Sequence, residues 1–163
     1  MAIKFNIDEV LKMAVRIEQG GAAFYTRAAG LKKDAASADF LKKLAAVEKQ
    51  HQAAFEAMRA ELTDDEKEAT AYDPWGEAEL YLEAMADTHG GEGDPKAAAK
   101  LTGRESLADI LTTAIGMEKD SILFYVGIKE LVPAHLGGKK IDKVIKEEWG
   151  HVAILQRHLK ELA

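Results

Sequence analysis

Hydrophobic side chains recur at steps of three and four residues along four long stretches of the chain. Such steps place side chains on one face of an α-helix. The pattern therefore predicts four helices, over residues 7–29, 35–62, 107–131 and 139–162. Ala, Leu, Lys and Glu dominate these stretches, and all four favour helices. The expected N-caps are Asn6 for the first helix, Asp34 or Ser37 for the second and Ser106 for the third. The sequence predicts an all-α protein.

The stretch between the second and third helices has a different composition, with an acidic start, two prolines and a group of glycines. We expect a short helix over 74–88, capped by Asp73, and a further turn or two after Pro95. The apolar residues of this short helix are expected to face the main body: Trp75, Leu80, Tyr81 and Met85.

Helices joined by a short, a long and a short connection form a four-helix bundle with one crossover. We therefore expect a single domain over residues 1–163, made of a helical hairpin (6–62), a long crossover containing short helices (63–105) and a second hairpin (106–163).

The two hairpins repeat one another at an offset of one hundred residues, without a gap. About a dozen positions are identical, and helical composition alone does not account for the pairs Glu18/Glu118, Glu48/Glu148 and His51/His151. We expect a pseudo-twofold axis between the hairpins. A residue of one hairpin that faces this axis then meets its own equivalent from the other.

Six polar residues fall on the apolar stripes, where a helix face should be buried. They are Glu18, Glu48, His51, Glu118, Glu148 and His151. A spacing of three residues puts Glu and His on one helix face, and each hairpin carries this pair once. Four buried carboxylates without a counter-charge are very costly, so two cations are expected to balance them. Each metal would have one terminal Glu and one His, with two Glu bridging. Imidazole ligands favour iron or manganese over magnesium or calcium.

Cysteine is absent, which excludes disulfides, thiolate-bound zinc, Cys-ligated iron–sulfur clusters and Cys nucleophiles. The formal net charge of -6 disfavours nucleic acid and anionic membranes as partners. Residues 1–10 lack the apolar core of a secretory signal, and no run is long enough for a membrane helix. We therefore expect a soluble cytoplasmic protein.

The order Glu, Glu-x-x-His, Glu, Glu-x-x-His on a four-helix bundle resembles the ferritin-like di-iron carboxylate proteins. The runs Met-Glu-Lys-Asp-Ser-Ile-Leu-Phe-Tyr (117–125) and Glu-Glu-Trp-Gly-His (147–151) resemble the rubrerythrin family. The resemblance covers about 6–62 and 105–163. It implies a ferritin-like fold and a non-haem di-iron oxidoreductase that reduces hydrogen peroxide or dioxygen. Two iron ions are the implied cofactor, with manganese or zinc as alternatives.

Two features depart from the rubrerythrin pattern. Rubrerythrins usually carry a rubredoxin domain with four cysteines, so this chain would need an external electron donor such as a rubredoxin-like protein. They also typically carry a further Glu three residues after the lone Glu of the third helix, where this chain has Ser121. The symmetric ligand set also resembles bacterioferritin and manganese catalase. The alternatives are therefore iron handling, as a ferroxidase or storage protein, and a structural metal-binding bundle. A homodimer is expected, whereas a storage protein would form a large cage.

Three further residues are candidates for contact with the metal ligands: Tyr25, Tyr125 and His158. The alternative for the tyrosines is core packing with a satisfied hydroxyl. Five glycines inside the predicted helices indicate close helix approach or substrate access, namely Gly20, Gly21, Gly116, Gly127 and Gly150.

Overall fold

Four long helices make up the body of the protein in a computed structural model, which describes residues 7–68, 76, 77, 80, 84, 96–131 and 139–162. The long helices are α1 (Ile7–Leu31), α2 (Ala35–Ala60), α6 (Leu107–Leu131) and α7 (Lys139–Glu161). Each lies within two residues of its predicted bounds. The described residues contain no strand, so the all-α prediction is confirmed.

Side-chain caps fix where two of the long helices begin. Asp34 caps α2, since its carboxylate accepts a hydrogen bond from the backbone N–H of Ser37 at 2.7 Å. At α6, the hydroxyl of Ser106 accepts from the N–H of Asp109 at 3.1 Å, and the Asp109 carboxylate accepts from the N–H of Ser106 at 2.9 Å. This reciprocal pair satisfies two N–H groups at the start of the helix. The predicted cap Asn6 lies outside the described residues.

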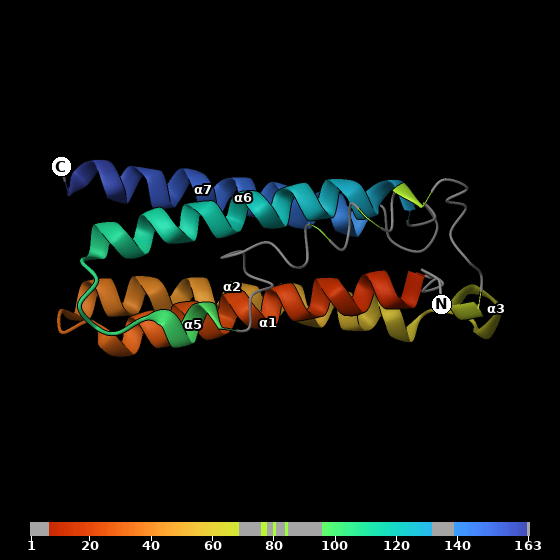
Figure 1. Ribbon diagram of the computed structural model, residues 1–163, viewed down its shortest axis with the longest axis horizontal. Coiled ribbons are helices and arrows are strands. Elements are labelled where there is room, and N and C mark those ends of the chain that lie inside the picture. Colours follow the sequence, from red (N-terminus) through yellow and green to blue (C-terminus); the bar gives the residue numbers. More distant parts are fainter. Residues whose placement is uncertain are drawn as a thin grey trace.

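The long helices pair as two hairpins, α1 with α2 and α6 with α7, and the hairpins lie side by side along their length (Figure 1). Two apolar clusters fill the space between the helices. One contains Phe55 and Ile128, and the other contains Phe24 and Leu111. Each long helix has residues in both clusters. The buried glutamates and histidines of each helix lie between the residues that it gives to one cluster and those that it gives to the other. The polar group therefore lies in the middle of the bundle, with apolar side chains towards both ends.

The crossover is anchored to the first hairpin at the residues that the structure describes. The short helix α5 (Ala97–Lys100) packs against α1, and it is the turn expected after Pro95. Arg27 and Lys32 of the first hairpin donate side-chain hydrogen bonds to the carbonyls of Leu101 and Glu105, at 3.4 and 2.9 Å. These contacts hold the end of the crossover beside α1 before the chain enters α6.

A second short helix, α3 (Asp64–Glu68), was not predicted as a separate element. Its signal is a capping box: Thr63 and Glu66 exchange side-chain and backbone hydrogen bonds of 2.8–3.3 Å. The helix predicted over 74–88 lies mostly outside the described residues, including Trp75, Tyr81 and Met85. Leu80 is described and is 65% exposed, so the prediction that it faces the main body is wrong.

The expectation of close helix approach is wrong for two of the five glycines. A Cβ placed on Gly116 or Gly150 would meet no atom within 4 Å, so neither glycine is required by close helix approach. None of the helices in the described part of the chain is long and apolar enough to cross a membrane.

Candidate metal centre

The six polar residues of the stripes meet in the centre of the bundle. Glu18 comes from α1, Glu48 and His51 from α2, Glu118 from α6, and Glu148 and His151 from α7. The four glutamates have no exposed surface, and the histidines are 2% and 6% exposed. Helical periodicity places each side chain on the buried face of its helix, and the packing of four helices brings the faces together.

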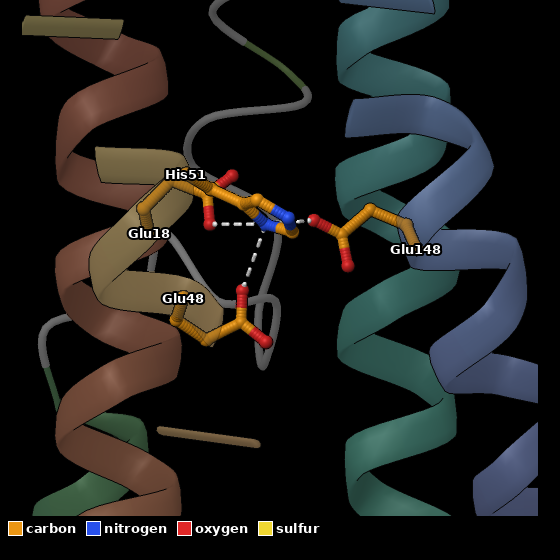
Figure 2. A group of neighbouring side chains, drawn as sticks. All are labelled: Glu18, Glu48, His51 and Glu148. Carbon is orange, nitrogen blue, oxygen red and sulfur yellow. Dashed lines mark ion pairs between the residues drawn. The ribbon is translucent and has the colours of Figure 1, made fainter. Parts of the chain in front are cut away.

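His51 is the centre of one group of four residues. Its Nδ1 lies 2.8 Å from a carboxylate oxygen of Glu148, 3.3 Å from Glu18 and 3.4 Å from Glu48. Figure 2 shows the imidazole between the glutamates of its own hairpin and Glu148 of the other. One ligand atom from each residue lies within 4.8 Å of all the others, so the four atoms are close enough together to hold one metal ion.

His151 is the centre of a second group, related to the first by the sequence repeat. Its Nδ1 lies 2.8 Å from Glu148, 3.3 Å from Glu48 and 3.5 Å from Glu118. The two imidazole rings lie nearly parallel, with centroids 5.8 Å apart. Glu48 and Glu148 belong to both groups, whereas Glu18 and Glu118 belong to one each. The arrangement offers two neighbouring ligand sets with two shared carboxylates.

Eight of the polar side-chain atoms at this centre are buried but have no hydrogen-bond partner. They are Glu18 Oε2, both carboxylate oxygens of Glu48 and of Glu148, Glu118 Oε2, and the Nδ1 atoms of His51 and His151. Buried polar atoms are nearly always hydrogen-bonded in proteins, because desolvation without a partner is costly. These atoms converge at short distances without the geometry of hydrogen bonds, as metal ligands do. Two divalent cations would also balance the four carboxylates in charge, so the residues fit a dinuclear metal site.

Without metal, protons compensate the charge of the cluster. Burial raises the pKa of Glu18 and of Glu118 well above the usual range of a glutamate. Burial would lower the pKa of His151, but the carboxylates around it outweigh this effect and raise its pKa to about 12. The same balance raises the pKa of His51. Burial would also raise the pKa of Glu148, but the two nearby imidazoles lower it to about 2. Metal ions entering the site must therefore displace protons.

The two candidate tyrosines contact the site, each across the bundle from its own helix. Tyr25 of α1 donates its hydroxyl hydrogen bond to Glu118, and Tyr125 of α6 donates its own to Glu18. Both tyrosines are fully buried. The hydroxyls bind the two glutamates that are not shared, and they leave the second oxygen of each glutamate without a hydrogen bond. The expected contact with the ligands is therefore present.

His158 is not brought to the site. Its ring packs against Phe40 with centroids 4.2 Å apart and the ring planes inclined by 37°, and its side chain is 43% exposed beside Glu161. The spacing of seven residues from His151 put it on the right face, but seven residues are about 10 Å along a helix, which is beyond contact. The expectation for His158 is wrong. Ser121 is buried, and its hydroxyl donates to the carbonyl of Met117 at 3.1 Å.

One contact was not anticipated from the sequence. The outer ring nitrogen of His51, Nε2, lies 2.8 Å from a carboxylate oxygen of Glu147 on α7. The available signal was the pair of adjacent glutamates, Glu147 and Glu148, which point to neighbouring faces of one helix.

Comparison with known proteins supports the architecture. No protein-family model matches the sequence, and no curated protein is significantly similar to it. Among solved structures, a crystal structure of a Thermotoga maritima protein, described as ferritin-like and as a diiron-carboxylate protein, superposes with a TM-score of 0.75. The match covers 100% of both chains at 21% sequence identity. The chain therefore has a ferritin-like fold.

Proposed function

We propose that this protein is a non-haem di-iron oxidoreductase of the rubrerythrin type, which reduces hydrogen peroxide or dioxygen. The observation that carries the proposal is the set of buried carboxylate and imidazole atoms that converge without hydrogen bonds. The ferritin-like fold supports it, because the structure that superposes on this chain is described as a diiron-carboxylate protein.

The ligand chemistry favours iron. Each ligand set combines one imidazole with three carboxylates, two of them shared. Magnesium and calcium prefer sites made of oxygen alone, whereas iron and manganese accept mixed nitrogen and oxygen ligands. The two shared carboxylates, Glu48 and Glu148, would place the two ions in neighbouring positions, where both could act on one small molecule.

The residues of the candidate metal centre would have different roles. Glu48 and Glu148 would hold both ions, and the remaining four ligands would hold one each. Tyr25 and Tyr125 orient the unshared glutamates by their hydroxyl hydrogen bonds. Apolar clusters lie on both sides of the site, and the six ligand candidates are buried between them. When bound, a ferrous pair would supply two electrons, and the reduction of one hydrogen peroxide to two water molecules would also consume two protons.

The electrons must be replaced after each turnover. The chain has no cysteine, so it holds no thiolate-ligated electron-transfer centre of its own. An external donor, such as a rubredoxin-like protein, would restore the ferrous pair.

The test is peroxide consumption by the iron-loaded protein. Under anaerobic conditions we expect each chain to bind two ferrous irons. Added peroxide should then be consumed rapidly, which stopped-flow absorbance measures. The double variant Glu48→Ala/Glu148→Ala should lose both properties. The matched control is Glu56→Ala/Glu161→Ala, which removes exposed carboxylates from the same two helices and should behave as the wild type. Equal peroxide rates for both double variants would overturn the proposal.

Two other functions would give different results. An iron-storage protein would elute as a large cage on size-exclusion chromatography and would retain oxidised iron in excess of two per chain. A structural metal-binding bundle would bind zinc in preference to iron, and its ligand variants would unfold with no reaction lost.

A further inference from the structure

The two histidines of the site differ in what their outer ring nitrogens contact. Nε2 of His51 lies 2.8 Å from a carboxylate oxygen of Glu147. The Nδ1 side of this imidazole therefore faces the candidate metal centre, and the Nε2 side faces the Glu147 carboxylate. Glu147 is 39% exposed and lies 3.6 Å from the ammonium of Lys143, on the same helix. The contact joins α2 of one hairpin to α7 of the other.

The sequence repeat shows that this contact has no counterpart. Each of the six ligand candidates has an identical equivalent one hundred residues away, but the equivalent of Glu147 is Val47. Within the part of the chain that the structure describes, Nε2 of His151 has no carboxylate partner. The repeat therefore conserves the identity of the six ligand candidates and of the two tyrosines, but not of the outer carboxylate at position 147.

An outer carboxylate changes what an imidazole offers to a metal. By accepting the Nε2–H hydrogen bond, the carboxylate fixes the tautomer that presents the lone pair of Nδ1 to the centre, and it fixes the ring orientation. It also makes the coordinating nitrogen more basic, and loss of such a partner typically lowers metal affinity by about 10–100-fold. Only His51 receives this support from Glu147.

We propose that Glu147 is a positioning residue that makes the two metal positions unequal, so that the one at His51 fills first and holds its metal more tightly. This inference rests on the dinuclear site of the proposed function, but it does not depend on which reaction the loaded protein performs.

The first test is stepwise metal affinity. Apo protein is titrated anaerobically with Fe²⁺ against a chromophoric chelator. The wild type should bind two ions in two steps that differ in affinity. In Glu147→Gln the first step should weaken by about 10–100-fold, while the second stays unchanged. Lys143→Gln, which retains the carboxylate, should resemble the wild type and serves as the control for surface charge on α7.

A second variant tests the same idea by gain of contact. The repeat relates position 47 to position 147 and His151 to His51, so a carboxylate at position 47 is expected to reach His151. Val47 is only half-buried, so a polar side chain is tolerated there. Val47→Glu should strengthen the weaker step and bring the two affinities together. This variant keeps the inference testable if Glu147→Gln does not fold, which circular dichroism will show.

A third measurement identifies which position fills first. With one equivalent of Zn²⁺, the ring-nitrogen NMR signals of His51 should shift before those of His151. Equal wild-type steps, simultaneous shifts, or unchanged affinities in both variants would overturn the inference. A protein that binds two irons unequally but consumes no peroxide would keep this inference and overturn the proposed reaction. Failure to bind two metals at all would overturn both.

Discussion

The hydroxyl of Tyr125 on α6 donates a hydrogen bond to the carboxylate of Glu18 on α1. The repeat-related residues make the equivalent contact, in which Tyr25 donates to Glu118. Each tyrosine therefore supports the glutamate of the opposite hairpin. Each tyrosine lies seven residues beyond the glutamate of its own helix, which is about 10 Å along the axis and too far for contact. Helices α1 and α6 run in opposite directions (Figure 1). The same seven residues therefore bring each tyrosine level with the glutamate of the other helix, as the two hydrogen bonds show.

The first prediction concerns these hydroxyls. Tyr125→Phe keeps the aromatic ring but leaves a buried carboxyl oxygen of Glu18 without its donor. We expect the metal-free protein to lose about 1–3 kcal/mol of unfolding free energy, the usual cost of an unsatisfied buried acceptor. Urea denaturation measures the change. Tyr25→Phe should give a similar loss, because the repeat provides the same contact to Glu118. A stability unchanged in both variants would show that the hydroxyls do not support the glutamates.

The second prediction separates shared from unshared ligands. Glu48 belongs to both ligand sets and Glu18 to only one. Glu18→Gln should therefore keep one tight metal per chain, whereas Glu48→Gln should weaken both. Equilibrium dialysis followed by elemental analysis measures the stoichiometry. Gln matches Glu in volume, so both variants should fold. The same stoichiometry in the two variants would contradict the division into shared and unshared glutamates.

The third prediction is the dependence of metal binding on pH. Burial keeps Glu18 and Glu118 protonated to higher pH than usual, and the surrounding carboxylates raise the pKa of His151 to about 12. Because their pKa values are raised, these groups keep their protons to higher pH in the metal-free protein, and metal binding must release those protons. The affinity should therefore fall as pH decreases, by about tenfold per pH unit for each proton released.

Calorimetry in buffers of different ionisation enthalpy measures that proton release directly. We expect more than one proton for each chain that takes up two metals. Binding without proton release, or affinity that rises as the pH falls, would be incompatible with the protonated cluster.

The fourth prediction uses glycines in two backbone settings. Gly116 lies inside α6 with open space where a Cβ would be, so Gly116→Ala should stabilise the protein by about 0.5–1 kcal/mol. Gly103 has a φ of +87°, and its Cβ would lie 3.3 Å from Leu31 Cδ2. Gly103→Ala should therefore destabilise the protein by about 1–2 kcal/mol. Thermal and urea unfolding compare the variants, and shifts of the same sign would contradict this assignment.

Local patterns account for the parts of the protein that the sequence predicted. The period of three and four residues is a property of one helix, so it located the long helices within two residues. The repeat at one hundred residues placed the glutamates and histidines at matching positions of their helices. The structure brings these six residues together, and their role as metal ligands stays a prediction.

Contacts between helices account for the parts that the sequence did not decide. His158 shares a stripe with His151 but packs against Phe40, because position along the axis matters as much as the face of the helix. Glu147 lies on the edge of the stripe, and only the packing of α7 against α2 brings it to His51.

By itself, the sequence determined the fold class, the helices and the residues that face the bundle core, because each of these follows from short-range periodicity and composition. Only the tertiary structure decided which tyrosine supports which glutamate, which histidine gains an outer carboxylate and which glutamates are shared. These relationships depend on the direction, rotation and spacing of neighbouring helices, which side-chain packing sets and which no single helix encodes.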